Sequence, residues 1–241
     1  MKFTSQGKVS ASMCDAEAKL SILGAVQLVQ DYVSEFLGAL KVDQTTMRAK
    51  HGAMWVFTKN QITGNCAIRW GEEYQVTCFI SSLSPVRMMI DIIFERNKEE
   101  GFYSRIEACV IDLTTQKVRR ITSDIIPPSC VDVADKRGNV LRLEVGNIEQ
   151  YQHIDDVEIR STSIDFCKHT NNTEYVRFIL NCFDVKALIE HPITQFEISY
   201  LAQTFEYDKL QILKKVENNT TSVLLCKNSE NVVFCRITQK I

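Results

Sequence analysis

The sequence lacks most of the short motifs that identify a cofactor site. None of its nine glycines takes part in a Gly-x-Gly-x-x-Gly or P-loop pattern, so no nucleotide-binding fold is indicated. No Gly-x-Ser-x-Gly elbow occurs, which disfavours the α/β-hydrolase class. The nine cysteines form no Cys-x-x-Cys pair and no Cys/His cluster with zinc spacing. We therefore expect neither a metal nor an organic cofactor, and we interpret the cysteines as mostly buried thiols.

Long apolar runs are also absent. No stretch approaches the roughly 20 apolar residues that a membrane span needs. Residues 1–6 lack the apolar core of a signal peptide, so we expect an unexported, cytoplasmic protein without a membrane partner. The formal net charge is −2 and the basic clusters are only two residues long, so no nucleic-acid partner is indicated.

The chain of 241 residues has room for two domains of about 120 residues. Two segments carry helical periodicity. The first, residues 20–37, places apolar residues at three- and four-residue steps, with Gly38 suited to a C-terminal stop. The second begins after Asn171 and Asn172, which can cap a helix, and its pattern extends to Leu188.

Most of the remaining sequence is typical of strands. Val157 to Ile164 also has strand-like composition. Polar turns at residues 114–116, 217–219 and 228–230 suit hairpins. The predicted strands are 53–59, 74–80, 88–94, 106–113, 118–121, 195–202, 209–216, 222–226 and 232–237.

A long helix followed by about four antiparallel strands therefore occurs twice, although the two halves share little sequence identity. This order predicts an α+β fold in which each helix is wrapped by an antiparallel sheet. Residues 126–150 hold Pro127-Pro128 and a turn at Lys136–Asn139, and they are the best linker candidate. We predict an N-terminal domain over 1–125, the linker over 126–150 and a C-terminal domain over 151–241.

One segment, residues 165–175, concentrates chemically active side chains. Asp165, Cys167 and His169 lie two apart, and a helix follows at once. If residues 165–169 are extended, the three side chains point to the same face. Unpaired N–H groups at the helix start would then polarise an acyl carbonyl placed there.

This segment resembles the signature of the acyl-ACP thioesterase family, Asp-x-Asn-x-His-Val-Asn-Asn-x-x-Tyr. Asp165, His169, Asn171, Asn172 and Tyr175 match it in order and spacing. The resemblance extends over nearly the whole chain. It includes Gln30-Asp31 in the first helix, Trp55 in the next strand, and Trp70-Gly71-Glu72.

The resemblance implies a tandem double hotdog that hydrolyses fatty acyl-ACP to free fatty acid and carrier protein. It implies one active site, mainly in the C-terminal domain, while the N-terminal domain shapes the acyl-chain pocket around residues 20–80. Asp165 and His169 would activate water or orient the thioester, and Asn171 and Asn172 would bind substrate. The acidic carrier would be met by basic side chains near the site, for which Lys168 and Arg177 are candidates.

Two departures from the family pattern matter for the chemistry. Cys167 stands where the family has Asn, and Gln203 aligns with a family Glu on the following strand. Gln can position water by hydrogen bonding but cannot accept a proton. Cys167 is either a nucleophile activated by His169 or a small side chain that fills the amide's place, and we favour the second interpretation.

The candidates also have structural interpretations. Asp165 would brace a helix start in any case, Asn171 and Asn172 are good caps, and Tyr175 suits the core. The alternative functions are an acyl-CoA thioesterase, a non-catalytic acyl-thioester binding protein and, less favoured, a dehydratase. Two fused domains already provide the pairing that single ones reach by dimerising, so both a monomer and a homodimer stay open.

Overall fold

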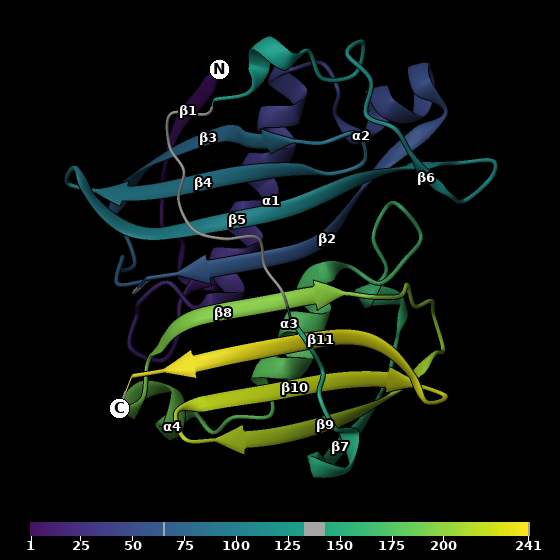
Figure 1. Cartoon of the computed structure of the whole chain (residues 1–241). Coiled ribbons are helices and arrows are strands. Elements are labelled where there is room, and N and C mark those ends of the chain that lie inside the picture. The colour runs from purple at the N-terminus through teal and green to yellow at the C-terminus, as the bar shows by residue number, and fades with distance from the viewer. Residues whose placement is uncertain (65, 133–142, 241) are drawn as a thin grey trace. The chain divides into compact units, whose positions relative to one another are not determined.

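The computed structural model describes residues 1–64, 66–132 and 143–240. The chain divides into two compact units, Met1–Val140 and Leu141–Ile241, and the division lies inside the segment expected as a linker. In each unit, helices pack on one face of an antiparallel sheet (Figure 1). The α+β prediction is therefore confirmed. No helix among the described residues is both long and apolar enough to cross a membrane.

The sheet of the first unit has the strand order β1-β3-β4-β5-β2, and β6 pairs with β5. All of these pairings are antiparallel. The strands are β1 (Lys2–Lys8), β2 (Ala53–Thr63), β3 (Glu73–Leu83), β4 (Met88–Arg96), β5 (Glu99–Asp112) and β6 (Val118–Arg119).

Helix α1 (Ile22–Ala39) packs its apolar stripe against β3 and β4. Ser21 caps it, because the side-chain oxygen of Ser21 accepts the N–H of Gly24. Gly38 does not stop the helix, which corrects the prediction. The chain turns at Lys41 instead, where φ is +60° and the N–H bonds the Gly38 carbonyl. A short helix α2 (Gln44–Thr46) and a π-helical turn (Met47–His51) follow.

The second unit has the strand order β8-β11-β10-β9-β7. The predicted hairpin turns are confirmed, with positive φ at Asn218, Asn228 and Ser229. Its strands are β7 (Gln152–Glu158), β8 (Ile193–Tyr200), β9 (Lys209–Glu217), β10 (Thr220–Lys227) and β11 (Glu230–Gln239).

The helix of the second unit is shorter than predicted. Helix α3 (Asn172–Leu180) stops after nine residues, and a separate helix α4 (Val185–Glu190) follows. Asn181 and Asp184 flank the break, and such side chains favour helix ends over helix interiors. The continuation of this helix to Ala187 and Leu188, which the sequence pattern allowed, is therefore not observed.

Strand β1 was not predicted, and of β7 only its last two residues were, because both strands are mostly polar and lack an apolar face. β1 alternates between exposed and half-buried residues, and most of β7 is exposed. Both strands lie at the end of their unit's strand order, where one neighbour provides the hydrogen bonds. The predicted run from Val157 to Ile164 is strand only as far as Glu158, because Ser161–Ser163 form a 3-10 turn.

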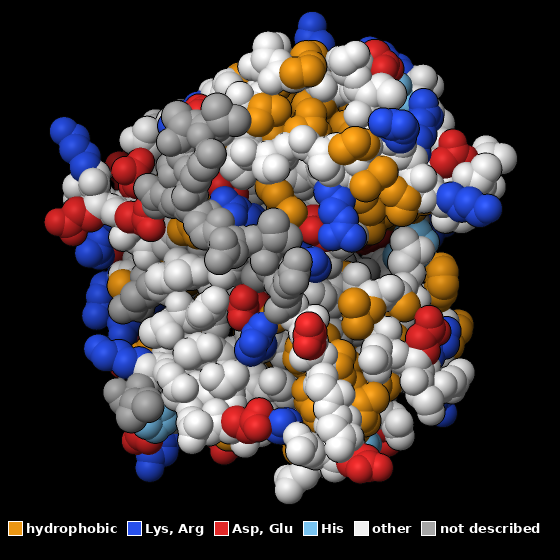
Figure 2. Space-filling model, in the orientation of Figure 1, with side chains coloured by type: hydrophobic (Ala, Val, Ile, Leu, Met, Phe, Trp, Pro, Cys, Tyr) orange, Lys and Arg blue, Asp and Glu red, His pale blue; other side chains and the backbone are white. Residues whose placement is uncertain are grey.

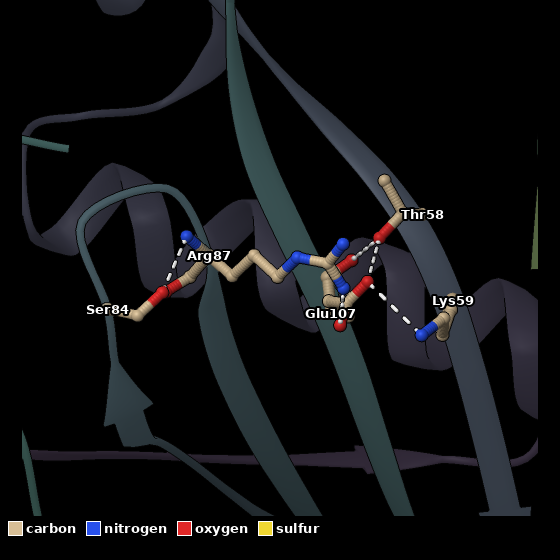
Figure 3. Close-up of polar contacts among 5 residues, drawn as sticks. All are labelled: Thr58, Lys59, Ser84, Arg87 and Glu107. Carbon is tan, nitrogen blue, oxygen red and sulfur yellow. Dashed lines mark hydrogen bonds and ion pairs between the residues drawn. The ribbon is translucent and has the colours of Figure 1, made fainter. Parts of the chain in front are cut away.

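A charged cluster is built on β2 and β5 of the first unit (Figure 3). The Glu107 side chain is only 3% exposed and receives hydrogen bonds from Thr58 at 2.6 Å and Arg87 at 2.8 Å. Lys59 Nζ lies 3.6 Å from the same carboxylate. Burial by itself raises the pKa of Glu107, but these partners together hold it below its usual value.

In the second unit, residues 143–151 lie on the sheet face away from α3, where Figure 1 shows them crossing β11, β10 and β9. Apolar side chains gather over these strands in Figure 2. Part of the expected linker therefore belongs to the packed unit, while the turn predicted at Lys136–Asn139 lies outside the described residues. The cluster consists of Leu224, Cys226 and Phe234, with Leu143, Val145, Tyr151 and Leu213 against it.

Candidate active site

The segment from Asp165 to His169 is a tight turn rather than extended chain, so the condition under which its side chains would share one face is not met. The Asp165 N–H bonds the His169 carbonyl at 2.9 Å, and the Lys168 N–H bonds the Asp165 carbonyl at 2.9 Å. Ile164 and Thr170 form an antiparallel bridge at the base of the turn. Alternation along a strand therefore does not bring the three candidate side chains together, but the turn keeps them within five residues.

The Asp165 carboxylate has a structural partner inside the turn. Its Oδ1 accepts the Cys167 N–H at 2.7 Å, which forms an Asx turn. The chain then passes through Lys168 at a φ of +71°. Asp165, Cys167 and His169 are all half-buried, whereas Lys168 and Phe166 are exposed.

The loop after β8 lies beside this turn and carries Gln203. The Thr170 N–H donates to the Thr204 carbonyl at 3.0 Å. The Phe205 ring contacts the His169 ring edge-on, with 5.3 Å between centroids. Gln203 is exposed and lies in this loop beyond the end of β8, not on a strand as predicted. The structure thus brings the His169 and Gln203 segments together, although they are 34 residues apart.

A surface hollow of about 500 Å³ opens beside the turn. Lys168 and the aromatic side chains of Phe205 and Tyr207 contribute to its wall. Tyr207 is 66% exposed and Phe205 is 48% exposed, and the neighbouring Phe166 is 78% exposed. The other residues that line the hollow are Ser161, Ile164 and Glu206.

The start of α3 is already capped. The Asn171 side-chain oxygen accepts the Thr173 N–H at 3.0 Å, and its carbonyl accepts the Glu174 N–H. The Asn171 N–H itself bonds Ser163. The prediction of a helix start with several unpaired N–H groups is therefore wrong. Of residues 171–174, only Asn172 has an N–H without an acceptor in the described parts of the chain.

The first unit contains the same turn, 150 positions earlier in the chain. Asp15 accepts the Glu17 N–H at 2.9 Å, bonds the Lys19 carbonyl through its own N–H, and is followed by Ala18 at a φ of +58°. Ser21 caps α1 as Asn171 caps α3. An aspartate at the head of the turn is thus common to both units, whereas an imidazole is present only in the second, where His169 replaces the lysine.

Buried hydroxyl groups of Thr170, Thr204 and Tyr175 lie beside the turn, and of these residues the sequence indicated only Tyr175, as a core residue. Thr204 Oγ1 lies 2.7 Å from both Thr170 Oγ1 and Tyr175 Oη. Tyr175 is 2% exposed, in agreement with the core interpretation, and burial raises the pKa of its phenol. One signal for Thr170 was available, because the family signature has Val at this position.

No group of three or more His, Cys, Asp or Glu side chains within residues 1–64, 66–132 and 143–240 is arranged to hold a metal ion. The other histidines have local partners. His51 lies near Asp124, His153 near Asp156, and His191 near the Lys240 carbonyl.

Two family models match the chain. The acyl-ACP thioesterase N-terminal domain matches residues 1–128, and the acyl-ACP thioesterase C-terminal domain matches residues 147–237. Among characterised proteins, the chloroplastic dodecanoyl-[acyl-carrier-protein] hydrolase of Umbellularia californica is 22% identical over 190 residues. This alignment covers 76% of the chain and spans about half (50%) of the length of that relative.

Solved structures of similar proteins share the fold over their full length. An acyl-ACP thioesterase from Bacteroides thetaiotaomicron superposes with a TM-score of 0.88 at 18% identity, covering 99% of this chain and 98% of that one. The 12:0-ACP thioesterase from Umbellularia californica gives a TM-score of 0.87 at 20% identity, with coverages of 99% and 97%. At these identities the likeness establishes a common fold.

Proposed function

The chain belongs to the acyl-ACP thioesterase family, and we propose that it hydrolyses fatty acyl-ACP to free fatty acid and carrier protein. The proposal assigns the chemistry to the turn at residues 165–169 and to the loop after β8, both in the second unit. It includes the tandem hotdog domains at 1–125 and 151–241, with the acyl-chain pocket in the first.

One observation carries the proposal. The two units share a turn with the same backbone hydrogen bonds, but only the second places an imidazole in it, beside a loop that carries Gln203. Lys19 and Ala67 stand at the corresponding positions of the first unit. Because the same turn forms in the first unit with a lysine in place of the histidine, the presence of His169 in the second unit supports a chemical role.

In the proposed reaction, His169 acts as the general base. It takes a proton from a water molecule while the water oxygen attacks the thioester carbonyl carbon. Gln203 holds that water by a hydrogen bond, since its amide cannot accept the proton. The tetrahedral intermediate then expels the carrier's pantetheine thiolate, and His169 returns the proton to it. The C–S bond breaks, a C–O bond forms, and no cofactor is consumed.

The remaining candidates have supporting roles in this scheme. The Asp165 carboxylate favours the protonated imidazole electrostatically while it holds the turn. The Asn172 N–H is the donor left for the developing oxyanion, because Asn171 is occupied as a cap. Cys167 occupies the family's Asn position as a small side chain rather than as a nucleophile.

The partner in this proposal is the acidic carrier protein, met by the exposed Lys168 and by Arg177. Arg177 is about half exposed (48%), although it also pairs with Glu174 at 3.3 Å. A cytoplasmic location fits this partner and forms part of the proposal, as does a monomer that can pair further into a homodimer.

The test is hydrolysis of acyl-ACP substrates of graded chain length, beside the matching acyl-CoA series, with release of free thiol measured continuously. Turnover that favours the carrier-bound series supports the proposal, provided that His169→Gln lowers it by about 10²-fold or more. Equal or better turnover of acyl-CoA would assign the chain to the acyl-CoA thioesterases. Tight binding of acyl thioesters without turnover would show a binding protein, with Cys167 and Gln203 as the reason.

A further inference from the structure

Three buried hydroxyl groups join the His169 turn to the Gln203 loop. Thr170, Tyr175 and Thr204 are 5%, 2% and 0% exposed. Thr204 Oγ1 lies 2.7 Å from each of the other two hydroxyl oxygens, and Thr170 Oγ1 donates to the Thr204 carbonyl at 3.1 Å. We call these three residues the hydroxyl staple.

One orientation of the protons satisfies the whole staple. Tyr175 donates to Thr204 Oγ1, Thr204 donates to Thr170 Oγ1, and Thr170 donates to the Thr204 carbonyl. That carbonyl also accepts the Thr170 N–H, so both of its lone pairs are used. A fully satisfied buried network of this kind selects one geometry, since any displacement leaves a polar group without a partner.

The first unit shows that the fold does not need these hydroxyl groups. The Leu20 N–H bonds the Ile68 carbonyl at 2.8 Å, as Thr170 bonds Thr204 in the second unit. Leu20 and Ile68 are apolar and buried, and Ala25 occupies the helix position that corresponds to Tyr175. The same backbone bridge therefore forms around apolar side chains.

The hydroxyl staple also adjoins the two residues of the proposed reaction, His169 and Gln203. Thr170 follows His169, and Thr204 follows Gln203 in the chain. Thr204 precedes Phe205, whose ring rests against the His169 imidazole. This chain has Thr170 where the family signature has Val, so the hydroxyl group that bonds Thr204 from the turn is a departure from the family pattern.

We propose that Thr170, Thr204 and Tyr175 are positioning residues that hold the His169 imidazole in register with Gln203. The inference rests on the proposed function for its kinetic consequence, but the placement of the imidazole can be measured without turnover. Because Gln203 cannot share the proton transfer, the water has to be placed accurately by geometry.

The experiment compares Thr204→Val, which removes the central hydroxyl at similar volume, with Thr204→Ser, which retains it. Tyr175→Phe removes the phenol oxygen. Tyr151→Phe is the matched control, since its hydroxyl donates to the Val145 carbonyl at 2.8 Å in the same unit, in the cluster on the sheet face away from α3. Steady-state kinetics on acyl-ACP and an NMR pH titration of the His169 imidazole, assigned with His169→Gln, are measured on each full-length protein.

We expect Thr204→Val and Tyr175→Phe to lower kcat by about 10- to 100-fold with little change in KM, as a small misplacement of a catalytic group does. Their His169 titrations should shift relative to the wild-type protein. Thr204→Ser should recover most of the rate, and Tyr151→Phe should match wild type in both measurements.

An unchanged kcat and an unchanged His169 titration in Thr204→Val would overturn the inference, whatever happens to thermal stability. If the wild-type protein hydrolyses no acyl-ACP, the proposed function fails, and the titration alone decides the inference. A shift in Thr204→Val that Thr204→Ser reverses would then support positioning, and identical titrations would refute it.

Discussion

The two equivalent aspartates allow the structural and chemical roles of Asp165 to be separated. Asp165 and Asp15 each head the same turn and accept backbone N–H groups through Oδ1. Replacement by Asn keeps a carbonyl acceptor and removes the charge, whereas replacement by Ala removes both. The first unit supplies the reference for what the turn alone requires.

The expected magnitudes follow from these contacts. Loss of a side-chain acceptor at such a turn costs about 1 kcal/mol, by analogy with helix caps. For a chain of this size, that lowers Tm by about 2 to 4 °C. Asp165 and His169 are joined by a backbone hydrogen bond, and residues paired in this way carry Cβ atoms roughly 5 Å apart. Two unit charges at that distance interact by about 3 kcal/mol at an effective dielectric constant of about 20, or roughly two orders of magnitude in rate.

The assay combines kcat on acyl-ACP with thermal unfolding for Asp165→Asn, Asp165→Ala, Asp15→Asn and Asp15→Ala. We expect both Ala variants to lose a few degrees and both Asn variants to unfold close to wild type. Only the two changes at Asp165 should lower kcat, by about 100-fold.

Full activity of Asp165→Asn would refute the reasoning, since it would show that the carboxylate only stabilises the turn and does not act on His169. A loss of kcat in Asp15→Asn equal to that in Asp165→Asn would also refute the reasoning. The charge at Asp165 would then have no special relation to His169.

Four further outcomes are expected. His169→Gln should lower kcat by about 10²- to 10⁴-fold on acyl-ACP, while Lys19→Gln at the equivalent position leaves it unchanged. Cys167→Ala should keep at least a tenth of the wild-type rate, and loss of all turnover would instead identify a nucleophile. Gln203→Glu should raise kcat, and its kcat should increase with pH as the new carboxyl ionises. A kcat that does not change with pH, or that is below wild type, would exclude a carboxylate role at this position. The folded-state pKa of Glu107 is lowered, so its stabilisation is present above its ordinary pKa and is lost as pH falls through the lowered value. Glu107→Gln should therefore cost about 2 kcal/mol at neutral pH in urea unfolding and weaken the acid sensitivity, and an unchanged pH dependence would contradict this.

The sequence predicted the apolar strands well because their signal is local. Nine predicted strands overlap observed ones, from β2 through β11 with β7 excepted, since alternation and β-branched residues mark them within a few positions. The polar strands β1 and β7 carry no such signal. Each is a strand only because a neighbour, β3 or β9, offers it a row of hydrogen bonds.

For the site, the sequence by itself determined the residue types and their neighbourhood. The spacing of Asp165, His169, Asn171 and Tyr175 indicated the family, and Asn171 indicated a helix start, because a cap is a local interaction. The site roles of Asp165, Cys167, His169, Gln203, Asn171 and Asn172 stay predictions.

Only the tertiary structure decided how these residues are used. It made residues 165–169 a turn rather than an extended segment, and at the start of α3 it paired the Thr173 N–H with the Asn171 side chain. It also brought Thr204 against Thr170 across 34 residues. Such contacts depend on hydrogen bonds between distant segments, whose partners leave no periodic mark in the sequence around either one.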